Sequence, residues 1–144
     1  MPFSTAIDQA IIDCYTGKNA TFAKPTAMYI GLSSTTPTKT GGNVTEPTGV
    51  GNYARIEVTS AQFDSAADIG GTTTGTSNNA EKAFAACNAT WASGSNMTHL
   101  VMYNAITVGT FIGFKALTVP KPVFTGDTFK IAIGDLDIVL GGTF

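Results

Sequence analysis

The feature that most constrains the fold is an alternation of apolar and polar residues that recurs from residue 27 to residue 140. In segment 53–59, for example, Ala54, Ile56 and Val58 occupy every second position. Successive side chains of a β-strand point to opposite faces, so a period of two predicts strands with one buried face. Seven segments show the pattern and are predicted to be strands: 27–33, 53–59, 80–86, 98–104, 110–117, 127–133 and 135–140.

Stretches rich in Gly, Asn and Pro separate these segments and are typical of turns. Short strands between frequent turns predict a mainly β fold, namely an antiparallel β-sandwich or jelly roll with one short N-terminal α-helix. The composition does not shift along the chain. We therefore expect a single domain over residues 1–144, with the helix at about 5–16 and the sandwich at about 26–141.

The N-terminal segment has a helical rather than an alternating pattern. Its apolar residues fall at i, i+3, i+4, i+7 and i+8, and these are Ile7, Ala10, Ile11, Cys14 and Tyr15. Ser4 or Thr5 can cap the start of the helix, and Gly17 can end it. A three-turn helix is marginal by itself, so the apolar stripe must dock on the predicted sheet or on a neighbouring subunit.

Two polar segments are predicted to be long surface loops. Residues 34–52 contain two prolines and four glycines without an apolar run, and residues 69–79 are rich in Gly, Thr and Asn. Loops of this length in a compact domain are usually functional or form interfaces. We therefore expect the 34–52 loop and the N-terminal helix to carry contacts with other proteins.

The low charge of the chain narrows the classes of function. Charged residues make up only 12% of the sequence and the formal net charge is −2. A surface of hydroxyls and amides is inexpensive to bury against another protein, whereas binding to nucleic acid needs clustered Lys and Arg, which are absent. No apolar stretch reaches the roughly 18–20 residues that span a bilayer. The N-terminus shows no signal peptide, so we expect synthesis in the cytoplasm without export.

Candidate catalytic groups are sparse. His99 is the single histidine, and no nucleophile motif surrounds any serine or cysteine. Asp135 and Asp137 alternate on a predicted strand, which is more typical of a solvated strand face than of a cation site. We therefore predict no catalytic, cofactor-binding or metal-binding residues, no cofactor and no enzymatic activity.

Cys14 and Cys87 match neither a redox motif nor a zinc spacing. In a reducing compartment they are expected to be buried thiols. A disulfide that forms after release into an oxidising medium is the alternative.

Several segments resemble a family of small proteins from tailed-phage structural gene clusters that are often labelled tail fibre proteins. The similar segments are Pro25-Thr26, residues 29–38 (YIGLSSTTPT), residues 44–47 (VTEP) with 51–55 (GNYAR), Trp91, Thr98-His99, residues 116–118 with Lys121, residues 126–128 (GDT) and residues 134–136 (GDL). The resemblance covers nearly the whole chain. It implies a structural protein of the virion without catalytic activity.

Three functions remain open at this point. The leading hypothesis is a capsid decoration or cement protein on the particle exterior, because the chain is small, weakly charged and without a repetitive shaft. The alternative is a tail-fibre or minor-tail subunit that contacts the host surface. The third is a stand-alone carbohydrate-binding module.

We expect a homo-oligomer, a dimer or trimer, that contacts other virion proteins (the major capsid protein or tail proteins), and a host surface glycan in the fibre alternative. No contact with nucleic acid or membrane is expected. Trp91 is a core or interface residue by this interpretation, with glycan stacking as the lesser alternative. The candidate interface residues are Ile7, Ile11, Tyr15, Pro37, Val44, Pro47, Tyr53, Trp91 and Phe144.

Overall fold

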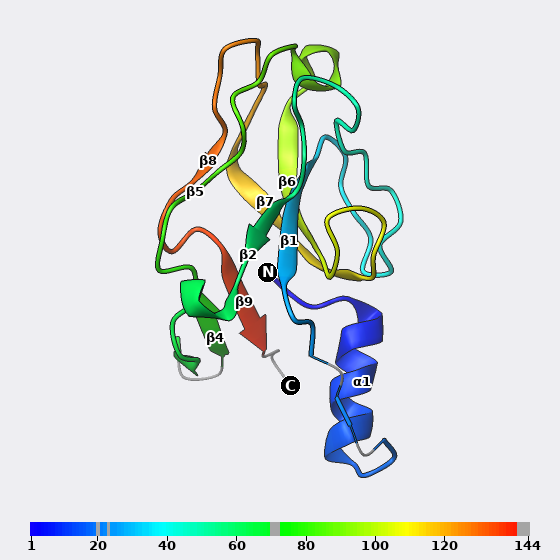
Figure 1. The fold of residues 1–144 in the computed structure, drawn as a ribbon. Helices are drawn as coiled ribbons and strands as arrows, with labels where there is room; N and C mark the ends of the chain where they lie inside the picture. Colours follow the sequence, from blue (N-terminus) through cyan, green and yellow to red (C-terminus); the bar gives the residue numbers. More distant parts are fainter. Residues whose placement is uncertain (20, 23, 70–72, 141–144) are drawn as a thin grey trace.

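A computed structural model describes residues 1–19, 21–22, 24–69 and 73–140. Within them the chain is mainly β, with several antiparallel sheets and one N-terminal helix, as the sequence predicts (Figure 1). The elements are α1 (Thr5–Tyr15), β1 (Met28–Ser33), β2 (Ile56–Val58), β3 (Ala67–Asp68), β4 (Thr74–Ser77), β5 (Lys82–Ala83), β6 (Met97–Tyr103), β7 (Phe111–Lys121), β8 (Lys130–Ile131) and β9 (Asp137–Leu140), with short 3-10 turns at Ser60–Gln62 and Trp91–Gly94.

The strands of the described residues form three sheets. The largest has the order β2-β1-β6-β7, a second has the order β3-β4-β9, and β5 pairs with β8. Every strand pair is antiparallel. β1 and β6 lie at the centre of the largest sheet, where Leu32 faces Leu100 and Ile30 faces Met102 across the strands.

The expectation of a loop over 69–79 is wrong, because β4 (Thr74–Ser77) lies within it and forms the middle strand of its sheet. A strand of Thr, Gly and Ser has no apolar alternation, so its pattern does not distinguish it from a loop. Gly75 is required here because a Cβ would lie 2.8 Å from the carbonyl oxygen of Ile138 on β9. The predicted strands 80–86 and 127–133 shrink to two residues each, in β5 and β8.

The largest sheet buries both of its faces. On β6, Leu100 and Met102 belong to the main core, while Val101 and Tyr103 belong to a second apolar cluster that also includes Phe111. Because neighbouring residues of a strand point in opposite directions, these two clusters lie on opposite sides of the sheet. The second face therefore needs a cover of its own.

The main core is built around Trp91, which is fully buried. Its ring meets those of Tyr53 and Phe84 edge to face, with centroids 5.1 and 5.8 Å away. The indole Nε1 donates a hydrogen bond of 2.9 Å to the carbonyl oxygen of Gly51. Gly51 has a φ of +63°, and a Cβ there would collide with Ala89 and Trp91. This hydrogen bond ties the end of the 34–52 segment to the core.

Helix α1 stands apart from the sheets (Figure 1). Ser4 caps it by accepting a hydrogen bond from the Ile7 N–H, and Gly17, with a φ of +75°, follows its last turn. The segment before the helix is attached to β7, because the Ser4 N–H donates to the carbonyl oxygen of Ile112. No residue of α1 is fully buried, and four of the five residues of its predicted apolar stripe, Ile7, Ala10, Ile11 and Cys14, are half-buried.

Replacing Trp91 by Ala should lower the free energy of unfolding by about 3–5 kcal/mol, the usual cost of removing a buried large aromatic side chain. Urea denaturation followed by circular dichroism measures the change. Phe124→Ala is the matched control, because Phe124 is 52% exposed and should change stability by less than about 0.5 kcal/mol. Equal effects of the two substitutions would contradict the core position of Trp91.

Candidate interaction surface

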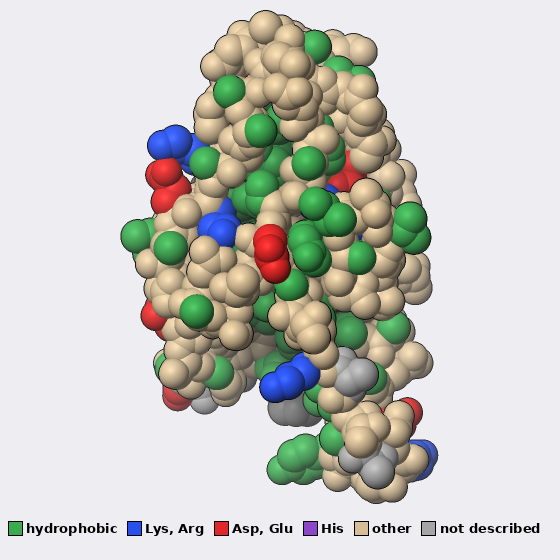
Figure 2. All heavy atoms as spheres, viewed as in Figure 1, with side chains coloured by type: hydrophobic (Ala, Val, Ile, Leu, Met, Phe, Trp, Pro, Cys, Tyr) green, Lys and Arg blue, Asp and Glu red, His purple; other side chains and the backbone are tan. Residues whose placement is uncertain are grey.

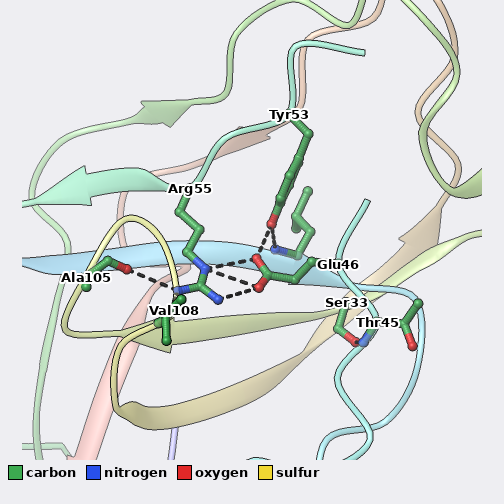
Figure 3. Close-up of polar contacts among 8 residues, drawn as sticks. Ser33, Thr45, Glu46, Tyr53, Arg55, Ala105 and Val108 are labelled. Carbon is green, nitrogen blue, oxygen red and sulfur yellow. Dashed lines mark hydrogen bonds and ion pairs between the residues drawn. The ribbon is translucent and has the colours of Figure 1, made fainter. Parts of the chain in front are cut away.

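A buried ion pair joins the 34–52 segment to the residues before β2 (Figure 3). Arg55 Nη2 lies 2.6 Å from Glu46 Oε2, and Arg55 Nε donates to both carboxylate oxygens at 3.1 Å. The side chains of Arg55 and Glu46 are only 10% and 7% exposed. Such a two-point contact between guanidinium and carboxylate fixes orientation as well as distance.

Tyr53 extends this cluster to β1. Its hydroxyl donates to Glu46 Oε1 at 2.6 Å and accepts a hydrogen bond of 2.8 Å from the backbone N–H of Leu32. The pairing of β2 with β1 ends at Ile30, so the Tyr53 hydroxyl satisfies a backbone donor that lies beyond the end of β2. Burial, followed by the negative charge of Glu46, raises the pKa of Tyr53 far above its ordinary value.

Gly31 makes room for the cluster on the face of β1. A Cβ at this position would collide with Glu46 Oε1 and would lie 2.7 Å from the Tyr53 hydroxyl oxygen. The carboxylate therefore rests directly on the backbone of the sheet. Ser33, the next residue on this face, accepts a hydrogen bond of 3.1 Å from the Thr45 N–H through its hydroxyl oxygen.

Arg55 also holds the connection between β6 and β7. Its Nη1 donates to the carbonyl oxygens of Ala105 at 3.1 Å and Val108 at 2.7 Å. The guanidinium carbon lies 3.4 Å from the centroid of the Tyr103 ring, which adds a cation–π contact. One arginine thus connects the 34–52 segment, the strand β6 and the 104–110 connection.

The 104–110 connection carries backbone strain and exposed apolar side chains. Val108 has a φ of +56°, a conformation that β-branched residues rarely adopt. Its side chain is 85% exposed and that of Ile106 is 52% exposed. Strained residues that the surrounding structure holds in place are concentrated at functional sites. This tip is therefore a candidate contact surface.

A shallow hollow of about 310 Å³ lies beside the tip, lined by Glu46, Thr48, Gly49 and residues 53–55 and 106–108. Glu46 Oε1 accepts hydrogen bonds from Tyr53 and Arg55, and Glu46 Oε2 accepts two from Arg55. Because the charged groups satisfy one another, the cluster holds the loops in position rather than offering free groups to a ligand.

The other groups considered for chemistry lie apart. Among the described residues, no three of the His, Cys, Asp and Glu side chains come together as metal ligands would. The His99 ring accepts or donates one hydrogen bond with Thr98, and burial lowers the pKa of His99. Cys14 is half-buried and Cys87 is buried, and both are free thiols. No helix in the described part of the chain is long and apolar enough to cross a membrane.

The candidate interface residues fall into distinct environments. Pro37, Pro47 and Trp91 are buried within this chain, so a partner does not reach them in this structure. Ile7, Ile11, Val44 and Tyr53 are half-buried, and Tyr15 is 93% exposed. Phe144 lies outside the described residues. An interface role for the accessible members stays a prediction.

The alternation of segment 53–59 would place Arg55 and Glu57 on one strand face, where they could pair, but Arg55 binds Glu46 instead and Glu57 is exposed. Tyr53–Thr59 does not form one continuous strand, since β2 begins only at Ile56. One signal pointed to the pair: Glu46 is the single acidic residue of the 34–52 segment, and Arg55 is the single arginine of the chain.

Comparison with known families gives one match that spans the chain. A family model described as podophage GP4 fiber I protein gp80 matches residues 2–139. The matched range includes α1, the 34–52 segment, the Glu46–Arg55 pair and the 104–110 connection. No curated protein shows significant sequence similarity to the chain.

Replacing Glu46 by Gln should destabilise the fold by about 3–5 kcal/mol, because it leaves the Arg55 charge buried without its partner. Urea denaturation is the measurement. Glu57→Gln removes the same charge at an exposed position and should change stability by less than about 0.5 kcal/mol. A similar, small effect of both substitutions would show that the pair does not hold the fold together.

Tyr53 should make stability fall at alkaline pH. Its pKa in the folded state is raised above the ordinary value of 10.0, so the folded protein retains a proton that the unfolded chain loses above this pH. The contribution of protonated Tyr53 to the free energy of unfolding is complete below pH 10 and is lost as the pH rises above this value. Denaturation between about pH 9 and 11, roughly one unit on either side of the ordinary tyrosine pKa, should show a smaller decline in the free energy of unfolding for Tyr53→Phe than for the wild type. Equal declines would contradict the raised pKa.

Proposed function

Because the chain belongs to the podophage GP4 fiber I protein family, we propose that it is a tail-fibre subunit. The chain is a structural component of the phage virion and not an enzyme. The observation that carries the proposal is the family match over residues 2–139, which leaves little of the chain for another role.

The fibre role replaces capsid decoration as the favoured function. Small size and low charge suit either location, because both describe a subunit that is packed against neighbours. The family description names a fibre, and it therefore supports the alternative hypothesis better than the leading one. As a fibre protein, the chain associates with other tail or virion proteins.

The exposed surface supports an assembling subunit. Apolar side chains that a monomer would normally bury are exposed at the C-terminal end of α1 and at the tip of the 104–110 connection; they are Ile12, Tyr15, Ile106 and Val108. The Glu46–Arg55 pair keeps the second of these places rigid before a partner arrives, which reduces the entropy lost on binding.

A sugar-binding role gains no support from the environments of Trp91 and Tyr53. Trp91 is fully buried, so its ring cannot stack on a glycan. Tyr53 uses its hydroxyl within the cluster of Glu46 and Leu32. The proposal therefore concerns contacts between virion proteins and names no glycan.

Localisation on intact particles tests the fibre role. Gold-labelled antibody against the purified chain should bind only at the tail, in low copy number per particle. An antibody against the major capsid protein, applied in parallel, controls for access to the head. Label distributed over the head lattice would overturn the fibre proposal and restore capsid decoration.

A further inference from the structure

The edge strand β7 is only partly paired. β6 lies along one of its edges (Figure 1), and among the described residues no strand is hydrogen-bonded along the other. The register with β6 also shifts between Met97 and His99, so residues 117–120 of β7 have no partner residue on β6. Most of these residues are exposed. β7 therefore presents backbone donors and acceptors with which a further strand can pair.

Residues 1–4 are already added to the beginning of this free edge. Phe3 pairs with Gly113 of β7 in an antiparallel bridge. On its other side the same segment is attached to β9, because the Val139 N–H donates a hydrogen bond of 3.2 Å to the carbonyl oxygen of Met1. The free edge of β7 therefore accommodates an extended segment that lies between it and another sheet.

A cleft continues along this edge beyond residues 1–4. It has a volume of about 240 Å³ and is lined by residues of both β7 and β8. Among the described residues, β8 is likewise paired on one side only, with β5. The large apolar side chains that line the cleft are Leu100, Leu117, Val119, Phe129 and Ile131. The cleft therefore combines incompletely paired strands with apolar side chains, which are the two features that bind an extended peptide.

The charges around the cleft indicate which kind of segment it suits. Charged side chains are few and scattered on the face shown in Figure 2, whereas three lysines and one aspartate line this cleft. Two of the lysines already bind carboxylates of this chain, but Lys121 takes part in no ion pair with a described residue. Its Nζ lies 4.6 Å from the centroid of the Phe129 ring. An acidic side chain of an added segment would pair with Lys121.

A second copy of β7 does not suit this edge. An antiparallel pairing of two copies centred on Thr118 would place Lys115 of each copy opposite Lys121 of the other. Like charges directly opposite one another destabilise a strand pair, and lysines on an edge strand commonly protect it from pairing with itself. The added strand therefore comes from a different segment.

We propose that a short extended segment of another virion protein is added to β7 in the cleft beside β8, with an acidic side chain of that segment at Lys121. The segment pairs with backbone groups of residues 116–119 and places apolar side chains against Leu117 and Phe129. Pro120 has no N–H and ends the available edge. The identity of the donor as a virion protein rests on the proposed fibre role, whereas the added strand itself does not.

Hydrogen–deuterium exchange tests the added strand without altering the protein. Mass spectrometry of peptic peptides compares the purified full chain with the same chain in intact particles. Residues 116–119 should exchange about tenfold more slowly in the particle, because the added strand accepts hydrogen bonds from their amides. Residues 56–58 form β2 at the other edge of the same sheet, and as the control they should exchange equally in both samples. Equal exchange of residues 116–119 in both samples, or equal slowing at both edges, would overturn the proposal.

Charge reversal at Lys121 tests the acidic side chain of the partner. Lys121→Glu should lower the copy number per particle by about fivefold, whereas Lys121→Arg keeps the charge and should be incorporated like the wild type. Circular dichroism of the free variants confirms that both are folded. Equal incorporation of the two variants would overturn the proposal of an acidic segment. Antibody label over the head, together with slowed exchange at residues 116–119, would contradict the fibre role and retain the added strand.

Discussion

The structure depends on a buried contact between Glu46 and Arg55. The central strands of the largest sheet are covered on both faces, and this contact holds the cover of one face in place. One face is covered by an ordinary apolar core around Trp91. The other is covered by the 34–52 segment, which has few apolar residues and no strand. A cover of this kind cannot be held by the hydrophobic effect alone. The carboxylate of Glu46 holds it, lying against Gly31 and bonded to Arg55 and Tyr53.

The environment of the pair compensates for its desolvation. Removing two charges from water costs several kcal/mol per ion unless further hydrogen bonds satisfy them. Tyr53 supplies one to the carboxylate, and the carbonyl oxygens of Ala105 and Val108 accept two from the guanidinium. These same contacts fix the 104–110 connection, including the strained Val108. The stability of the fold and the shape of the 104–110 tip therefore both depend on the Glu46–Arg55 pair, and a substitution in this pair alters both.

The period of apolar residues in the sequence predicts those helices and strands whose apolar side chains recur at the spacing of the element. It predicts α1, β1 and β6 to within a residue or two, because their apolar positions repeat with the period of the element itself. It fails for β4, which has no apolar alternation and whose Gly75 is required by the close approach of the β9 backbone. The Glu46–Arg55 pair is beyond this reasoning too, since the partners are brought together by a loop and not by a repeating geometry. Alternation instead places Arg55 beside Glu57.

The two exposed apolar surfaces, the tip of the 104–110 connection and the C-terminal end of α1, are attached to the body of the chain in different ways. The 104–110 tip is tied to the body of the single chain, because Arg55 donates hydrogen bonds to two of its carbonyl oxygens. Helix α1 is attached mainly at its N-terminal end, through Ser4 and the Asp8–Lys39 pair, and its far end makes no apolar contact that buries it. A short helix held at one end gains most of its stability from whatever covers its apolar face. A protein that covers the exposed end of α1 would therefore stabilise the last helical turn as it binds.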